Sequence, residues 1–133
     1  MGVIKFTQKD LDRNRPFEAG WKPVKVLSII ERLSKKKDSM NQVVTLDVTL
    51  DEDSREHEHT FSEKAIGMME PFISACLGKP VEAGVEYPTE AFVGSELFAE
   101  FTKEIFKDQA NPNDRGRPIN KVIGWASKDN PPF

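Results

Sequence analysis

Residues 42–50 of this 133-residue chain are QVVTLDVTL, and the alternation of side chains in this stretch decides the fold class. Every second residue from Val44 to Leu50 is aliphatic, whereas the three residues between them are threonine or aspartate. A period of two is typical of a β-strand that buries one face. The stretch therefore predicts a strand, and we expect its neighbours in the sequence to extend the same sheet.

A strand-like segment lies on each side of residues 42–50. Residues 21–33 are rich in β-branched and aliphatic side chains, but their apolar positions change parity after Val26. This change predicts either a β-bulge or a strand shared between two sheets. On the other side, residues 51–54, three acids and a serine, indicate a tight turn that leads into a returning strand over 55–61. The three segments together predict an antiparallel meander.

An apolar run with the density of a buried helix follows the meander. Ser62 is a candidate N-cap and Gly78 a candidate C-terminal stop, so the residues between them are expected to form a helix. Pro71 should kink or split this helix, because proline lacks the N–H of the helical ladder.

A fourth strand is predicted over residues 92–106, after a connection rich in proline and glycine. The alternation of this segment places Leu97, Ala99 and Phe101 on the inward face. Phe98 then points outward, where a large apolar ring requires a partner.

The last strand is expected over residues 119–126. Three strands, a helix and two strands form the element order of the OB-fold. The sequence therefore predicts a mainly β fold, a five-stranded OB-fold barrel with one helix between strands 3 and 4. Its length fits one domain, and we divide the chain into an N-terminal arm, an OB-fold domain and a C-terminal tail, over residues 1–20, 21–126 and 127–133.

Positive charge is concentrated in two loops of a chain whose net charge is −3. Residues 1–37 carry ten Lys and Arg against four Asp and Glu, residues 38–100 three against fourteen, and residues 101–133 six against four. Residues 35–37 are three lysines between predicted strands 1 and 2, and residues 115 and 117 are arginines between predicted strands 4 and 5. These are the loops that flank the groove of an OB-fold. They predict a local site for phosphates, with two outward or strand-end rings as candidates for base stacking. The predicted nucleic-acid-binding residues are Lys35, Lys36, Lys37, Arg115, Arg117, Lys121, Phe98 and Trp125.

The C-terminal residues form a second candidate site. A terminal ring with a free carboxylate, preceded by two prolines that keep the chain extended, can be captured by a pocket with a basic rim. A frayed end of no consequence is the alternative. The predicted partner-binding residues are Asp129, Pro131, Pro132 and Phe133.

Catalytic and metal-binding signals are weak. His57 and His59 share one face of a strand, but the sequence supplies no further well-placed His or Cys for a metal site. Cys76 lies among apolar residues and is expected to be a buried small side chain. No glycine-rich phosphate loop or nucleophile motif occurs, so we expect neither an enzyme nor a cofactor. Without a long apolar run or a signal peptide, a soluble cytoplasmic protein is expected.

The chain resembles the small OB-fold single-stranded-DNA-binding proteins encoded by bacteriophages. The resemblance rests on the element order and on three segments, AGWKPVKVLSIIERLSKKKDSMNQVVTLDV, FVGSELFAEF and RGRPINKVIGW. It implies a protein that coats and protects single-stranded DNA during replication or recombination, in the host cytoplasm. The ending NPPF is similar to the acidic Pro-Phe tip by which bacterial single-stranded-DNA-binding proteins recruit replication and repair proteins, although Asp129 is its one acid.

Two functions thus remain open from the sequence. The first is sequence-tolerant binding of single-stranded DNA, as a monomer or a homo-oligomer. The second is an OB-fold module that docks on a replication protein without binding nucleic acid, which the net negative charge favours.

Overall fold

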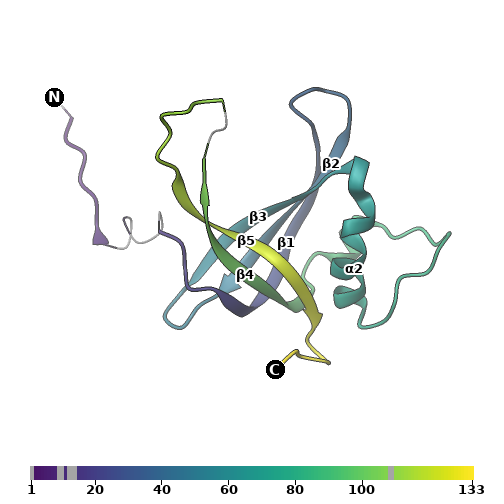
Figure 1. Ribbon diagram of the computed structural model, residues 1–133. Helices are drawn as coiled ribbons and strands as arrows, with labels where there is room; N and C mark the ends of the chain where they lie inside the picture. Colours follow the sequence, from purple (N-terminus) through teal and green to yellow (C-terminus); the bar gives the residue numbers. More distant parts are fainter. Residues whose placement is uncertain (1, 9–10, 12–14, 108–109) are drawn as a thin grey trace.

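Five strands form one antiparallel sheet in the computed structural model, which describes residues 2–8, 11, 15–107 and 110–133 (Figure 1). The sheet order is β3-β2-β1-β4-β5, and β3 and β5 do not pair within these described residues. The fold is therefore mainly β with an open sheet, and the predicted position of one helix between the third and fourth strands is confirmed. The strands are β1 (Gly20–Leu33), β2 (Met40–Thr49), β3 (Ser54–Phe61), β4 (Glu96–Phe106) and β5 (Arg117–Ser127).

The change of parity in β1 is a β-bulge. The register between β1 and β2 shifts between Val26 and Ser28, so Leu27 is an extra residue. Val26 is buried in the core, whereas Leu27 is 38% exposed. A bulge of this kind increases the local bend and twist of a strand. Of the two readings of residues 21–33, the bulge is confirmed, because β1 belongs to a single sheet.

The helical segment is split, as Pro71 predicted. The 3₁₀ helix η1 (Glu63–Met69) begins after Ser62, whose side chain caps it, and the α-helix α2 (Glu70–Leu77) follows with Pro71 in its first turn. At this position the missing N–H of proline has no helical partner to lose. Gly78, with φ +73°, ends α2 in the left-handed conformation.

The fourth strand begins later than its alternation predicts. Thr89–Phe92 forms a short 3₁₀ helix, η2, and Gly94 with φ +92° turns the chain before β4 starts at Glu96. Phe92 is nevertheless buried, so this residue is apolar because it packs in the core, although it does not belong to the strand. The expected strand over 92–106 is thus wrong at its first four residues.

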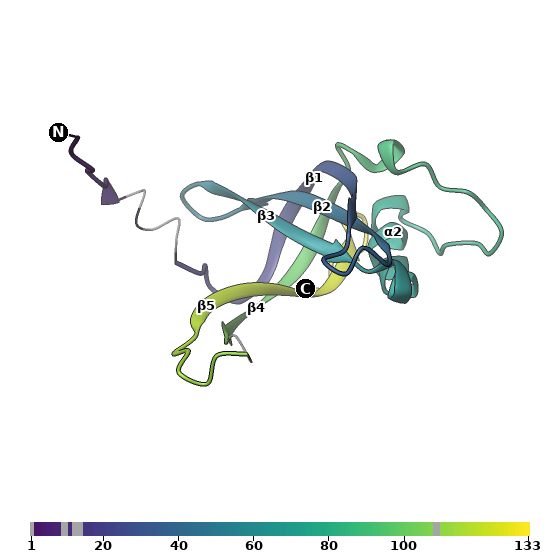
Figure 2. The ribbon, with the colours of Figure 1, turned by 90° about the horizontal axis from the view of Figure 1, so that it is seen from above.

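The core fills the inside of the curved sheet and is covered at one end by α2 (Figures 1 and 2). Rings from the two edge strands meet there, with the centroids of His59 on β3 and Trp125 on β5 5.6 Å apart. Phe72 of α2 lies 4.8 Å from Trp125 and is fully buried. The sheet therefore curls until its edges are joined by side chains, without a ladder of hydrogen bonds between them in the described chain.

Candidate nucleic-acid interface

The β1–β2 loop presents three exposed lysines, Lys35, Lys36 and Lys37. The Ser34 N–H donates to the Ser39 carbonyl oxygen, and the Lys37 N–H donates to that of Ser34, both at 2.9 Å, which closes the turn. Asp38 lies in the same loop, and its ion pair with Lys64 of η1 lowers the pKa of its carboxyl, with help from the Ser34 hydroxyl. The acid nearest to the lysines thus already has a cationic partner.

The β4–β5 connection brings cations together with an exposed ring. The guanidinium of Arg117 lies 5.5 Å from the centroid of Phe106, its register partner on β4, and Phe106 is 49% exposed. Arg115 and Lys121 are also exposed on this arm. Arginine over an aromatic face is a favourable cation–π arrangement that also presents donors to a phosphate.

Gly116 shapes the loop between the two arginines. Its φ is +82°, and its N–H donates to the Asp114 carboxylate at 2.9 Å. A Cβ at this position would lie 2.5 Å from Cγ2 of Ile105 and 3.1 Å from the carbonyl oxygen of Phe106. The loop therefore packs closely against the end of β4, and a side chain at residue 116 would clash with that strand.

Both basic loops rise on the same side of the curved sheet (Figure 1). The cations predicted from distant segments thus border one side of the molecule. The outer face of β3 carries acids, however, because Glu56 and Glu58 are exposed. Arg32 of β1 neutralises Glu58 through an ion pair of 2.9 Å.

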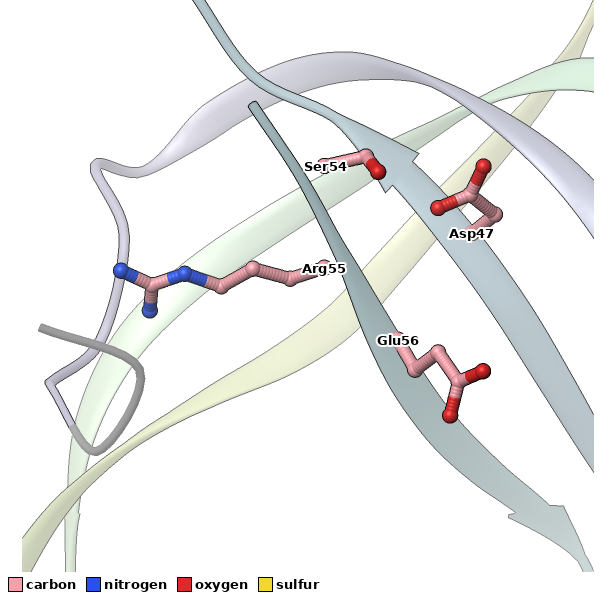
Figure 3. A pocket seen from close by; sticks show the side chains of 4 residues that line it. All are labelled: Asp47, Ser54, Arg55 and Glu56. Carbon is pink, nitrogen blue, oxygen red and sulfur yellow. The ribbon is translucent and has the colours of Figure 1, made fainter. Parts of the chain in front are cut away.

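A shallow pocket at the β2–β3 turn is acidic (Figure 3). Asp47 and Glu56 are register partners and lie on one side of the strands, whereas Arg55 points the other way (Figure 3). The Arg55 guanidinium donates to the carbonyl oxygen of Arg15 in the N-terminal arm. Two carboxylates on one side of the strands disfavour a phosphate at this pocket.

The two predicted stacking residues do not lie beside Arg117. Phe98 is eight residues before Phe106 on the same strand, roughly 26 Å at about 3.3 Å per residue. Trp125 packs into the core against Phe72 and Phe61. Phe106, an aromatic at a strand end directly before a polar loop, is the ring that the structure places beside Arg117.

The C-terminal tail supplies the partner of Phe98. The ring of Phe133 lies edge-on at 5.1 Å from that of Phe98, although Phe133 is still 77% exposed. Asp129, Pro131 and Pro132 line a hollow beside α2. The C-terminus and the two basic loops lie at opposite ends of the view in Figure 1, so the tail rests apart from the cations.

The side chains of His57, His59 and Cys76 are largely buried, and burial shifts their pKa values. Burial lowers the pKa of His57, and burial together with the positive charges of His57 and Lys121 lowers that of His59 to about 4. Burial raises the pKa of the Cys76 thiol to about 11, which keeps it protonated near neutral pH. Among the residues with a described position, no group of three or more His, Cys, Asp or Glu side chains is placed to hold a metal ion. Nor does any helix in the same part of the chain have the length and apolar character to cross a membrane.

Comparison of the sequence with protein-family models and with curated proteins found no match.

Proposed function

We propose that the protein binds single-stranded DNA without sequence preference and coats it during replication or recombination, as in the phage proteins that its sequence resembles. The sheet is then an OB-fold barrel opened between β3 and β5. The observation that carries the proposal is the exposed Phe106 with Arg117 over its ring, on an arm that also holds Arg115 and Lys121. A stacking ring beside several cations is the combination used by proteins that bind single strands.

The residues divide into two roles. Lys35, Lys36 and Lys37 on one loop, and the three cations of the β4–β5 arm, contact phosphates. Phe106 offers its face to a base after Arg117 moves from the ring to a phosphate. With six phosphate contacts, the logarithm of the binding constant should fall with the logarithm of salt concentration with a slope of about −4, at roughly 0.7 per contact.

Fluorescence anisotropy with labelled oligo-dT tests the proposal in two salt concentrations. Phe106→Ala should weaken binding by about 5- to 150-fold, because one stacked base contributes about 1–3 kcal/mol. Phe98→Ala is the matched control, since it removes the same side chain from the other end of β4 and should leave affinity unchanged. Equal losses in the two variants, or a binding constant indifferent to salt, would contradict the proposal.

A protein-binding role for the tail is the second candidate, and the contact of Phe133 with Phe98 favours it. This contact is slight, because most of the Phe133 ring remains accessible to another protein. Charge reversal at Lys36 and Arg115 separates the two functions. Loss of oligonucleotide binding supports the DNA-binding role, whereas unchanged behaviour supports the module that docks on a protein.

A further inference from the structure

A largely apolar cavity of about 590 Å³ lies between the helical segment and the connection that follows it. Its walls come from β2, η1, α2, the connection 79–88 and η2. Apolar surface is supplied by Met69, Ile73, Val81, Tyr87 and Phe92. Sites for small organic ligands are typically concave and of about 300–1,000 Å³, with apolar walls and few polar groups.

A buried acceptor lies in the wall of this cavity. Gln42 of β2 lines it, and the Gln42 Oε1 atom is buried without a hydrogen-bond partner among the described residues. Nε2 of the same amide donates to Glu31 at 3.5 Å, which identifies the oxygen as the inner atom. A buried carbonyl oxygen without a donor is costly. Rotation about the last side-chain bond, a torsion with broad preferences, exposes this oxygen to a ligand at the cost of the long hydrogen bond from Nε2 to Glu31.

The charge of the lining selects against anions. Among the described residues that line the cavity, Glu70 is the one carboxylate, Tyr87 adds a phenol, and there is no Lys or Arg. A phosphate-bearing nucleotide would meet a carboxylate without a compensating cation. The occupant is therefore neutral or cationic.

The outer wall is the connection over residues 79–88, which projects from the body of the molecule beside α2 (Figure 2). Val81 and Tyr87 of this connection pack against the core, and the Tyr87 ring lies 6.3 Å from that of Phe92. Within the connection, the Glu82 N–H donates to the Tyr87 hydroxyl at 3.0 Å. The cavity therefore lies between the helical body and a wall held to it by apolar side chains.

We propose that this cavity binds a compact aromatic group that carries an N–H donor and no negative charge, such as an indole ring. The apolar walls enclose the ring, and the N–H donates to Oε1 of Gln42. The ring belongs either to a free small molecule or to a tryptophan side chain of a protein partner. This site is separate from the basic loops and does not depend on the proposed DNA binding.

Titration of the ¹⁵N-labelled full chain with indole, followed by amide chemical shifts, tests the site. We expect saturable shifts at Gly67, Ala83 and Thr89, which line the cavity. Benzothiophene, in which sulfur replaces the N–H, should bind about tenfold more weakly, because it leaves the acceptor unpaired. Absence of saturable shifts in these residues, or equal affinity for the two probes, overturns the proposal.

Two variants assign the contacts. Gln42→Met keeps the size of the side chain but removes the acceptor, so indole and benzothiophene should bind it equally. Gly67 lines the cavity, and nothing lies within 4 Å of an added Cβ there, so Gly67→Leu fits without a clash and should reduce indole binding by adding bulk to the wall. Met68→Phe adds bulk at the next, exposed residue and should leave indole binding intact. Retained preference for indole in Gln42→Met refutes the role of Gln42.

Competition by N-acetyltryptophanamide identifies the source of the ring. Displacement of indole by this compound supports a tryptophan side chain of a partner. If indole binds but the amide does not compete, the cavity is too narrow for a residue within a peptide, and the ligand is a free small molecule.

Discussion

Acidification from pH 7.5 to pH 5.0 is expected to destabilise the fold through His59. The imidazole lies inside the curved sheet with its centroid 4.6 Å from that of Phe61 and 5.6 Å from that of Trp125. Burial first, and then the charges of His57 and Lys121, lower its pKa from 6.5 to about 4. The folded protein therefore resists a proton that the unfolded chain accepts below pH 6.5.

The sign and size follow from this difference in pKa. The stabilisation is fully present above pH 6.5 and is lost as the pH falls from there toward 4, because the unfolded chain binds the proton first. At about 1.36 kcal/mol per pH unit, the loss from His59 between pH 7.5 and 5.0 is at most about 2 kcal/mol. Since the ring is partly exposed and solvent screens its charge, we expect about 1–2 kcal/mol. His57 acts in the same direction, because its pKa is also lowered by burial.

Urea unfolding at the two pH values measures this loss. Far-ultraviolet circular dichroism is the appropriate signal, because protonation of His59 beside Trp125 would itself change the fluorescence of that residue. His59→Phe keeps an aromatic ring at the position and should reduce the difference in unfolding free energy between the two pH values by about 1–2 kcal/mol. A difference as large in His59→Phe as in the parent would refute the reasoning.

Two further substitutions test the loop and the arm. Gly116→Ala should lower the melting temperature more than Gly84→Ala, because φ is near +80° at both residues but the new Cβ is crowded only at Gly116, where it meets the carbonyl oxygen of Phe106. Equal shifts in differential scanning calorimetry would show that the left-handed backbone alone sets the cost. Asn120→Ala removes two hydrogen bonds to the backbone of Phe17 and one to the carbonyl oxygen of Thr102, and should lower the urea-unfolding free energy by about 2 kcal/mol. A loss below about 0.5 kcal/mol would show that these hydrogen bonds do not stabilise the fold.

Periodicity over a few residues predicted much of the sheet. Leu97, Ala99 and Phe101 are all buried as their alternation required, because the period of a strand is fixed by local geometry. The change of parity after Val26 located the bulge for the same reason. The start of β4 could not be predicted from periodicity. A 3₁₀ turn buries Phe92 as a strand would, and the positive φ of Gly94 leaves no trace in the pattern of apolar residues.

The aromatic residues of the candidate site could not be assigned in this way. Parity correctly turned Phe98 outward, but its contact with Phe133 joins residues 35 positions apart and depends on how the tail folds back. The sequence did not show whether the Trp125 ring, near a strand end, lines the groove or packs in the core. In the structure this ring packs against Phe72 of α2. Phe106 gained its importance from Arg117, which the register of β4 and β5 brings opposite. Each outcome depends on tertiary contacts that a local pattern does not contain.

The net negative charge does not exclude the proposed phosphate-binding surface, because three acids close to the cations already have donors. Asp38 is paired with Lys64, Glu58 with Arg32, and the Asp114 carboxylate accepts the N–H of Gly116. Charges farther away are screened within about 8 Å at physiological ionic strength. The field at the loops is therefore set by the exposed lysines and arginines there, whereas the distant acids limit binding of polyanions elsewhere on the surface. In the proposed DNA-binding role, a single strand would be held by these cations and by the Phe106 ring of the β4–β5 arm, and high salt should release it.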